Sequence, residues 1–453
     1  MKYRNLSLII LLFSFLLMFT KACAPEETEV ATPSPPEWSY NATIYEVNVR
    51  QFSEDGSFKA VEEALPRLRD MGVKIIWLMP IHPIGEVERK GTMGSYYSVK
   101  DFFDVNPEFG TKDDFRSLVE ATHAHDMKII LDWVANHTAW DNSLTETNPE
   151  FFETNEDGNF MPPRGTDWSD VIQLDYENPE VWDYMISALS YWVEEFNIDG
   201  YRCDVAYMVP TEFWNRARQE LDSIKPVFML AEAESPELHP AFDMSYTWRL
   251  HHAMNAIAQG EEPVSRIDEI IAEYRAEFPA NAFLMTFTSN HDENSWAGTV
   301  FERLGDGAKA FGVLSATMDG MPLVYNGQEV GLNKRLEFFE KDPIIWDFDS
   351  PFLDFYTRLL NLNLTNPVLR NGDRGAPMVR IETSAQESVY AFVRDDGINS
   401  VFVMLNLTGE PVTFTSTQIP GGEFTNLFTD EIENPALATE YTLAPWDYVV
   451  LHR

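Results

Sequence analysis

The amino-acid sequence predicts an α/β protein: a (β/α)8 TIM barrel with an inserted lobe after the third strand and a C-terminal antiparallel β-sandwich domain. Three observations support this prediction. Short apolar runs alternate eight times with helical stretches, a long interval without that pattern follows the third run, and only strand-like segments follow residue 366. Hydrophobic residues make up 44% of the 453-residue chain, which is enough for a large core.

Residues 1–22 have the pattern of a secretory signal peptide, because the basic residues Lys2 and Arg4 precede an apolar run that is short for a membrane span. Residues 23–37 are rich in Pro, Glu, Thr and Ser and lack apolar periodicity, so they are predicted to form a tether. We therefore expect an exported protein.

Cys23 follows Ala22 at the end of the apolar run, which resembles the cleavage site of a bacterial lipoprotein. Lys21, however, stands where that pattern prefers a small residue. Two expectations stay open. Either a lipid anchor at Cys23 holds the protein in the periplasm or at the outer membrane or cell surface, or the signal is cleaved nearby and the protein is secreted. Membrane contact is expected only through that anchor.

The barrel, including the lobe, is predicted over residues 38–366. Runs that are buried on both faces favour parallel pairing in a closed barrel. An open doubly wound sheet is the alternative, but no Gly-rich phosphate-binding turn follows any of the runs. The predicted strands are 42–49, 74–79, 128–132, 200–204, 227–232, 241–246, 283–288 and 322–325. The predicted helices include 58–70, 112–125, 179–196, 210–223 and 306–318, with a capping box at Thr111 and Asp114.

The long interval at about 133–174 follows the third strand, so it is predicted to form the lobe over the mouth of the barrel. The C-terminal domain is predicted over residues 367–453, where Gly, Pro and Asn separate short β-rich segments and no helix of useful length is expected. Its predicted strands are 388–394, 400–407, 412–417, 423–428 and 447–452.

The charge balance excludes some partners. The chain has 33 Lys and Arg residues against 73 Asp and Glu residues, which gives a formal net charge of -40. So large an acid excess repels phosphate backbones and anionic lipid surfaces, so nucleic acid is not expected as a partner.

Acidic residues stand at the C-terminal ends of three predicted strands, the edge that builds the active site in barrels of this class. Asp204 ends the fourth strand, Glu232 ends the fifth, and Asp292 follows the seventh. Strand alternation places Arg202 on the same face as Asp204. Cys203 lies between them in an apolar segment and is expected in the core. Three carboxylates and a cation at one rim predict a catalytic site rather than solvated strand ends.

Six segments in the same order resemble glycoside hydrolase family 13, the α-amylase family, and the resemblance runs from about Tyr40 to the C-terminus. They are DWVANH at 132–137, GYRCD at 200–204, AE at 231–232 and NHD at 290–292, which resemble four conserved regions, GMPLVYNGQE at 320–329, which resembles the eighth strand, and QLD at 173–175, which resembles the end of the lobe.

The resemblance implies retaining cleavage of an α-glucosidic bond, with Asp204 as nucleophile, Glu232 as general acid and base, and Asp292 binding sugar hydroxyls and stabilising the transition state. Retention requires two carboxyl groups about 5–5.5 Å apart, one of which stays protonated near neutral pH. We expect the raised pKa on Glu232, which ends the more apolar strand, whereas Arg202 is expected to keep Asp204 ionised.

The resemblance also assigns substrate binding to Tyr97, His137, Arg202 and His291. Tyr97 would pack against a pyranose ring. His137 and His291 would donate hydrogen bonds to the sugar at the cleavage point.

Three further residues leave alternatives open. Trp140 and Trp168 are either sugar platforms or part of the core of the lobe. Glu234 lies two residues beyond Glu232 on the same face and competes for the acid role, but the Ala–Glu pair of the motif favours Glu232.

The resemblance leaves the calcium site of the α-amylases open. Asn136 and Asp175 match two of its ligand positions, but Met208 stands where the family often places a histidine. A thioether is a poor ligand for a hard cation that prefers oxygen. Calcium is therefore the one candidate cofactor, and no organic cofactor is expected.

The expected function is hydrolysis of α-1,4-glucosidic bonds in starch-like glucans or maltooligosaccharides. A cyclomaltodextrinase or 4-α-glucanotransferase with the same carboxylates is the alternative, because the motifs do not decide whether water or a sugar hydroxyl intercepts the glycosyl-enzyme. A non-catalytic glucan-binding protein is less favoured, since such a protein would be expected to have lost one of the three acids.

Overall fold

The computed structural model describes residues 34–453. The predicted signal peptide, Cys23 and most of the predicted tether lie outside these residues. Within the described residues, no helix combines the length and the apolar character needed to cross a membrane.

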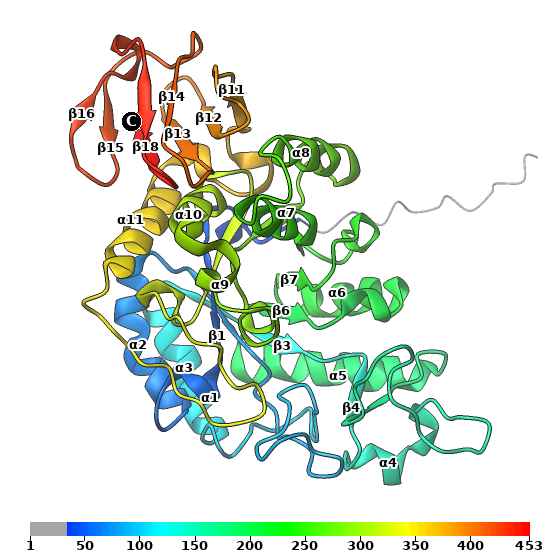
Figure 1. Ribbon diagram of the computed structural model, residues 1–453. Helices are drawn as coiled ribbons and strands as arrows, with labels where there is room; N and C mark the ends of the chain where they lie inside the picture. The colour runs from blue at the N-terminus through cyan, green and yellow to red at the C-terminus, as the bar shows by residue number, and fades with distance from the viewer. Residues whose placement is uncertain (1–33) are drawn as a thin grey trace, which may run out of the picture. The chain divides into compact units, whose positions relative to one another are not determined.

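Eight parallel strands close into the predicted barrel in the order β1-β10-β9-β8-β7-β6-β3-β2. Figure 1 labels four of these strands, β1, β3, β6 and β7. Each strand coincides with one of the eight predicted runs, with ends that differ by a few residues. The strands are β1 (Ile44–Val47), β2 (Ile75–Leu78), β3 (Lys128–Trp133), β6 (Gly200–Cys203), β7 (Phe228–Ala231), β8 (Met244–Tyr246), β9 (Phe283–Thr286) and β10 (Met321–Tyr325).

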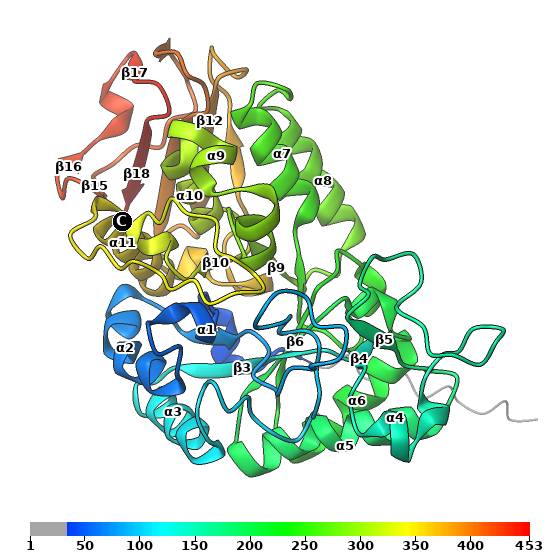
Figure 2. The same ribbon diagram turned by 60° about the horizontal axis from the view of Figure 1, so that its bottom comes forward.

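Helices follow one another around the outside of the strands (Figure 2). Five were predicted: α2 (Phe58–Met71), α3 (Lys112–Ala124), α5 (Pro179–Phe196), α6 (Thr211–Ile224) and α10 (Ala308–Thr317). The predicted capping box is present at the start of α3, because the Thr111 side chain accepts from the Asp114 amide and the Asp114 side chain accepts from the Thr111 amide. Further helices are α1 (Val49–Phe52), α7 (Trp248–Ala258), α8 (Arg266–Glu277), α9 (Val300–Leu304) and α11 (Pro351–Thr365).

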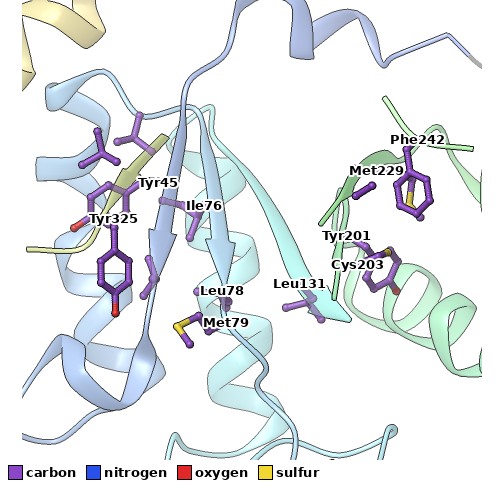
Figure 3. Packing of buried hydrophobic residues seen from close by; sticks show 14 of the residues in the cluster. Tyr45, Ile76, Leu78, Met79, Leu131, Tyr201, Cys203, Met229, Phe242 and Tyr325 are labelled. Carbon is purple, nitrogen blue, oxygen red and sulfur yellow. The ribbon is translucent and has the colours of Figure 1, made fainter. Parts of the chain in front are cut away.

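Side chains alternate between the two faces of the barrel wall, as the period of a strand requires. On β2, Ile75 and Trp77 belong to the cluster that fills the barrel, whereas Ile76 and Leu78 belong to the cluster between strands and helices (Figure 3). The same alternation places four charged side chains on the inner face of the barrel, near the C-terminal ends of the strands. They belong to Glu46, Asp132, Arg202 and Glu232.

Close approach of two strands requires glycine at the start of β6. Gly200 has a φ of +151°, and a Cβ atom there would lie 1.9 Å from the carbonyl oxygen of Phe228 on β7. A side chain at this position would separate the two strands that carry Asp204 and Glu232.

The predicted lobe follows β3. It contains a short antiparallel pair, β4 (His137–Ala139) and β5 (Val171–Gln173), and the helix α4 (Leu144–Thr147). Phe151 and Phe152 are buried there and anchor the lobe through their aromatic side chains.

The C-terminal domain has two antiparallel sheets. The larger has the order β11-β12-β13-β18-β15-β16, and the smaller pairs β14 with β17. Phe402 and Leu451 of the larger sheet share one apolar cluster with Phe414 and Leu443 of the smaller, so the predicted sandwich is confirmed. The strands are β11 (Val379–Ile381), β12 (Val389–Asp395), β13 (Ser400–Asn406), β14 (Val412–Phe414), β15 (Phe424–Asn426), β16 (Ile432–Glu433), β17 (Tyr441–Leu443) and β18 (Tyr448–His452).

Candidate active site

A pocket of about 480 Å³ opens where the barrel strands end, and it collects most of the predicted site residues. The three predicted catalytic acids, both predicted histidines and Tyr97 line it. Its remaining lining comes from the lobe and from the segments that follow β2, β6, β9 and β10. The lining residues are Lys90, Ser95, Tyr97, His137, Asp167, Trp168, Asp170, Val171, Asp204, Val205, Glu232, His291, Asp292, Trp296, Phe338 and Phe339.

Arg202 is the centre of the carboxylate cluster. Its Nη1 donates to Asp132 Oδ1 at 2.8 Å and to Asp204 Oδ1 at 3.1 Å. Its Nη2 forms an ion pair with Glu232 Oε1 at 2.9 Å. Arg202 is fully buried and does not line the pocket, so it lies beneath the acids. Its influence on a bound substrate therefore passes through the carboxylates that it holds.

The electrostatics of the two central acids differ in part from the sequence expectation. Burial and the repulsion by Glu232 raise the pKa of Asp204 well above its ordinary value. Burial also raises the pKa of Glu232, as predicted. Arg202 lowers the pKa of Asp204, as expected, but burial and the repulsion by Glu232 outweigh its effect. Both carboxyl groups therefore hold a proton to higher pH than isolated carboxyls would.

Tyr97 is fixed in the pocket by the groups beneath it. Its hydroxyl donates to Asp132 Oδ2 at 3.1 Å and lies 2.8 Å from His291 Nε2. Its ring is nearly parallel to that of Phe338, with 6.3 Å between the ring centroids. The predicted stacking tyrosine therefore faces the pocket with a fixed orientation.

Glu46 on β1 belongs to the site, although the sequence pattern did not single it out. Its carboxylate pairs with His291 Nδ1, and both side chains are buried. Burial lowers the pKa of His291, but Asp292 and Glu46 outweigh it and raise that pKa to about 9. The available signal was a single charged residue inside the apolar strand Ile44–Val47.

The pKa of His137 is shifted in the opposite direction to that of His291. Burial lowers its pKa to about 3, so the ring is neutral. Its Nδ1 lies 3.2 Å from Asn136 Nδ2, and its ring packs beside Trp168, with 5.6 Å between the centroids. The two predicted histidines of the pocket therefore differ in charge: His137 is neutral, and His291 is cationic.

An aromatic wall extends the pocket beyond the acids. Trp296 follows β9 and is 56% exposed, and Phe338 packs against it with 5.2 Å between the ring centroids. Phe339 lies beside them in the loop after β10. Trp296 lies in a π-helix of five residues (Glu293–Ala297), and Phe338 and Phe339 lie in a loop, so these segments are too short or too irregular for periodicity to identify them.

Val205 follows Asp204 in the left-handed region, with a φ of +36°. A β-branched residue rarely adopts this conformation, which costs about 1–3 kcal/mol. The strained backbone directs the Val205 amide at Glu232 Oε2, which accepts its hydrogen bond at 2.7 Å. Backbone strain is therefore located between the two central acids.

The structure places the three residues whose roles the sequence left open. Glu234 pairs with Arg249 at 2.8 Å and does not line the pocket, whereas Glu232 does. Trp140 donates its Nε1 proton to the Ser169 carbonyl, and Trp168 is the lobe tryptophan that lines the pocket.

Cys203 is buried in the core, as predicted. Burial raises the pKa of its thiol well above the ordinary value, so the thiol stays protonated and unreactive.

The two predicted calcium ligands accept hydrogen bonds from within the protein. Asn136 Oδ1 accepts a hydrogen bond from Gln173 Nε2 at 2.9 Å, and Asp175 Oδ1 accepts one from the Glu177 amide at 2.9 Å. Over residues 34–453, no group of three or more His, Cys, Asp or Glu side chains is arranged to hold a metal ion.

Known proteins are similar to this chain in sequence. The sequence is 26% identical over 422 residues to "Alpha-amylase MalA" of Haloarcula japonica, a match that covers 88% of this chain and 60% of that relative. It is 24% identical over 444 residues to "Alpha-amylase 2" of Dictyoglomus thermophilum, and this match covers 89% of this chain and 75% of that relative. The chain thus spans less than two thirds of the first relative.

Solved structures agree with the fold over most of both chains. The structure resembles a maltogenic α-amylase from Thermotoga neapolitana with a TM-score of 0.83 and 30% identity, covering 91% of this chain and 98% of that one. It resembles an α-amylase from Lactobacillus plantarum with a TM-score of 0.82 and 32% identity, covering 91% and 99%.

The family profile described as "Alpha amylase, catalytic domain" matches residues 40–168 and 166–350, the stretch that builds the barrel, the lobe and the pocket. This match takes in the three predicted catalytic acids, Arg202 and both histidines of the pocket. The chain therefore belongs to the α-amylase family of glycosidases.

Proposed function

We propose that the protein is a retaining glycoside hydrolase that cleaves α-1,4-glucosidic bonds in starch-like glucans or maltooligosaccharides. One observation carries the proposal: Asp204 and Glu232 bind the two terminal nitrogens of one guanidinium at the floor of a pocket. The Val205 amide, next to Asp204, ties Glu232 to the same place. These contacts hold the two carboxyl groups close together. They favour the distance of about 5–5.5 Å between the carboxyl groups of retaining enzymes over the 6.5–9.5 Å of inverting enzymes.

The roles are assigned from the motifs, in which Asp204 ends the segment GYRCD and Glu232 ends the Ala–Glu pair. The ionised form of Asp204 attacks the anomeric carbon while Glu232 gives its proton to the departing glycosidic oxygen, so that the C–O bond breaks and a glycosyl ester forms on Asp204. Glu232, now ionised, takes a proton from water. The resulting hydroxide attacks the same carbon, which releases Asp204 and restores the starting state with the anomeric configuration retained.

The remaining pocket groups support binding at the cleavage point. Asp292 is 37% exposed, more than Asp204 or Glu232, and so is accessible to sugar hydroxyls. The cationic His291 contacts Glu46 and the Tyr97 hydroxyl through its two ring nitrogens and contributes positive charge at the cleavage point, and His137 lines the same pocket. Tyr97 offers an oriented ring face to a pyranose.

The proposal is tested by incubating the purified protein with maltoheptaose and following product length and anomeric form by NMR. Retention predicts that α-anomers appear before mutarotation. Initial β-anomers would contradict the mechanism. Products longer than the substrate would favour the transferase alternative, in which a sugar hydroxyl replaces water in the second step.

Trp296 is expected to bind sugar outside the cleavage point. Truncation to Ala removes an exposed aromatic platform and should raise KM for maltoheptaose about 3- to 10-fold while changing kcat little, since stacking contributes about 0.5–1.5 kcal/mol. Steady-state kinetics on maltoheptaose and maltotriose check this. Trp296→Phe keeps a ring and is the matched control, for which KM should stay near the wild-type value. Equal losses in kcat for both variants would argue against a platform.

The His291–Glu46 pair predicts the alkaline limit of activity. His291 has a pKa of about 9, so its positive charge is lost as the pH rises through that value. Glu46 raises this pKa, so Glu46→Gln should move the alkaline limb of kcat/KM to lower pH by about one unit or more. The pH profile of kcat/KM is the measurement.

Glu329→Gln is the matched control for that change, because Glu329 is equally buried but is paired with Arg67 away from the pocket. Its profile should keep the wild-type alkaline limb. An unchanged limb in Glu46→Gln would show that His291 does not set it.

We also propose export, with a lipid anchor at Cys23 that places the protein in the periplasm or at the outer membrane or cell surface. Support comes from the basic start, the apolar run and the cysteine at its end. A Cys23→Ser variant should move from the detergent phase to the aqueous phase in a partitioning assay. A wild-type protein found only in the aqueous phase would contradict the anchor and favour secretion.

A further inference from the structure

The junction between barrel and lobe contains a polar cluster centred on Gln173. Its side-chain Nε2 lies 2.9 Å from Asn136 Oδ1, 3.0 Å from the Asn136 carbonyl oxygen and 3.1 Å from the Leu174 carbonyl oxygen. All three residues are buried. Three acceptors around one atom require a donor there, so the amide nitrogen of Gln173 occupies the centre of an oxygen cluster.

Converging oxygens are also what a hard cation uses. Calcium takes six to eight oxygen ligands, several of them carboxylates, at about 2.3–2.6 Å. Here the three oxygens are neutral and lie farther from the central atom. A neutral donor satisfies them, whereas a dication with this ligand set would have no anionic partner in the cluster.

The cluster connects directly to the pocket. Gln173 pairs with His137 across β4 and β5. Asn136 Oδ1 accepts a hydrogen bond from the Gln173 side-chain amide. This contact orients the Asn136 side chain so that its Nδ2 group donates to His137 Nδ1 at 3.2 Å. An amide nitrogen can only donate, so His137 Nδ1 accepts this hydrogen bond and a proton on the ring belongs on Nε2.

We infer that the amide of Gln173 takes the place of a cation at the junction of barrel and lobe, and that it positions His137 through Asn136. The junction is therefore held together without a metal. Gln173 is a positioning residue: it contacts no substrate and acts through the histidine. The second half of the inference rests on the proposed function, since a fixed tautomer of His137 matters for sugar binding.

Thermal unfolding tests the first half without any substrate. The wild-type midpoint should be the same after dialysis against EDTA and after addition of Ca²⁺, and calorimetric titration with Ca²⁺ should show no binding. In Gln173→Glu, a carboxylate oxygen faces three carbonyl oxygens, so the midpoint should fall in EDTA and recover with Ca²⁺. A wild-type midpoint that falls on chelation and recovers with Ca²⁺, or a Gln173→Glu variant indifferent to both, would overturn the inference.

Two further variants separate this effect from general damage. Gln219→Glu makes the same charge change on an exposed residue of α6 and should respond to neither EDTA nor Ca²⁺. Gln173→Leu removes the donor without adding charge, so its midpoint should fall and Ca²⁺ should not restore it. If Gln173→Glu does not fold in EDTA, its refolding yield should rise with Ca²⁺, and an equal yield with and without Ca²⁺ would overturn the inference.

The tautomer of His137 tests the second half. NMR of ¹⁵N-histidine-labelled protein should show the Nε2–H form of His137 in the wild type and a mixture of tautomers in Gln173→Leu. An unchanged tautomer in that variant would overturn the positioning role. None of these readouts involves turnover, so failure here would leave the proposed glycosidase function intact, and failure of the maltoheptaose experiment would leave the metal-free junction intact.

Discussion

Asp204→Asn is expected to lower turnover of maltoheptaose on the order of 10⁴-fold or more, because the amide is not a nucleophile and no glycosyl ester forms. The variant should fold normally. The pKa of Asp204 is raised in the folded state, so ionising this carboxyl opposes folding above its ordinary pKa. Replacing it by a neutral isostere should therefore leave the thermal midpoint at neutral pH unchanged or raise it. Full activity in this variant would refute the assignment.

The role of Asp204 can be separated from that of Glu232 with α-glucosyl fluoride and azide. In Asp204→Ala, azide fits the space left by the carboxylate and should displace fluoride to give the β-glucosyl azide. In Glu232→Gln, fluoride needs no protonation to leave, so the glycosyl-enzyme should accumulate and be visible by mass spectrometry. Azide should then intercept it as the α-glucosyl azide. If Asp204→Ala gave the α-glucosyl azide and Glu232→Gln gave the β-glucosyl azide, Asp204 would be the general acid and Glu232 the nucleophile.

Arg202→Met is expected to lower the unfolding free energy by about 3–5 kcal/mol, the usual cost of leaving buried charges without their partner. Arg202 is fully buried and binds Asp132, Asp204 and Glu232. Without it, the folded-state pKa values of these acids rise further. The folded protein then binds more protons than the unfolded chain, so stability should fall as the pH rises. Denaturant unfolding at mildly acidic and alkaline pH measures both effects.

The double variant Arg202→Met with Asp204→Asn is the control for this prediction. It removes one of the three repelling carboxylates and should recover part of the lost stability, most clearly at alkaline pH. Arg202→Lys keeps the charge but loses the fork that reaches several carboxylates, so its stability should lie between those of the wild type and Arg202→Met. Wild-type stability in Arg202→Met at all pH values would show that the guanidinium does not hold the cluster together.

The order of strands and helices, the lobe and the β domain were predictable because each depends on local patterns. Apolar runs identified the barrel strands, and the capping pair at Thr111 and Asp114 identified the start of α3. Asp204 and Glu232 were predictable because the C-terminal ends of parallel strands meet at one rim, whatever the details of the fold.

The sequence by itself therefore determined the fold class, the family and the central acids, since these follow from periodicity and from motifs of adjacent residues. Tertiary structure alone decided what depends on distance. It brought Glu46 from the first strand to His291, placed Trp296 and Phe338 in one wall, and filled the predicted calcium position with the amide of Gln173. It also raised the pKa of Asp204, because electrostatic coupling depends on burial and on how many carboxylates share one cation.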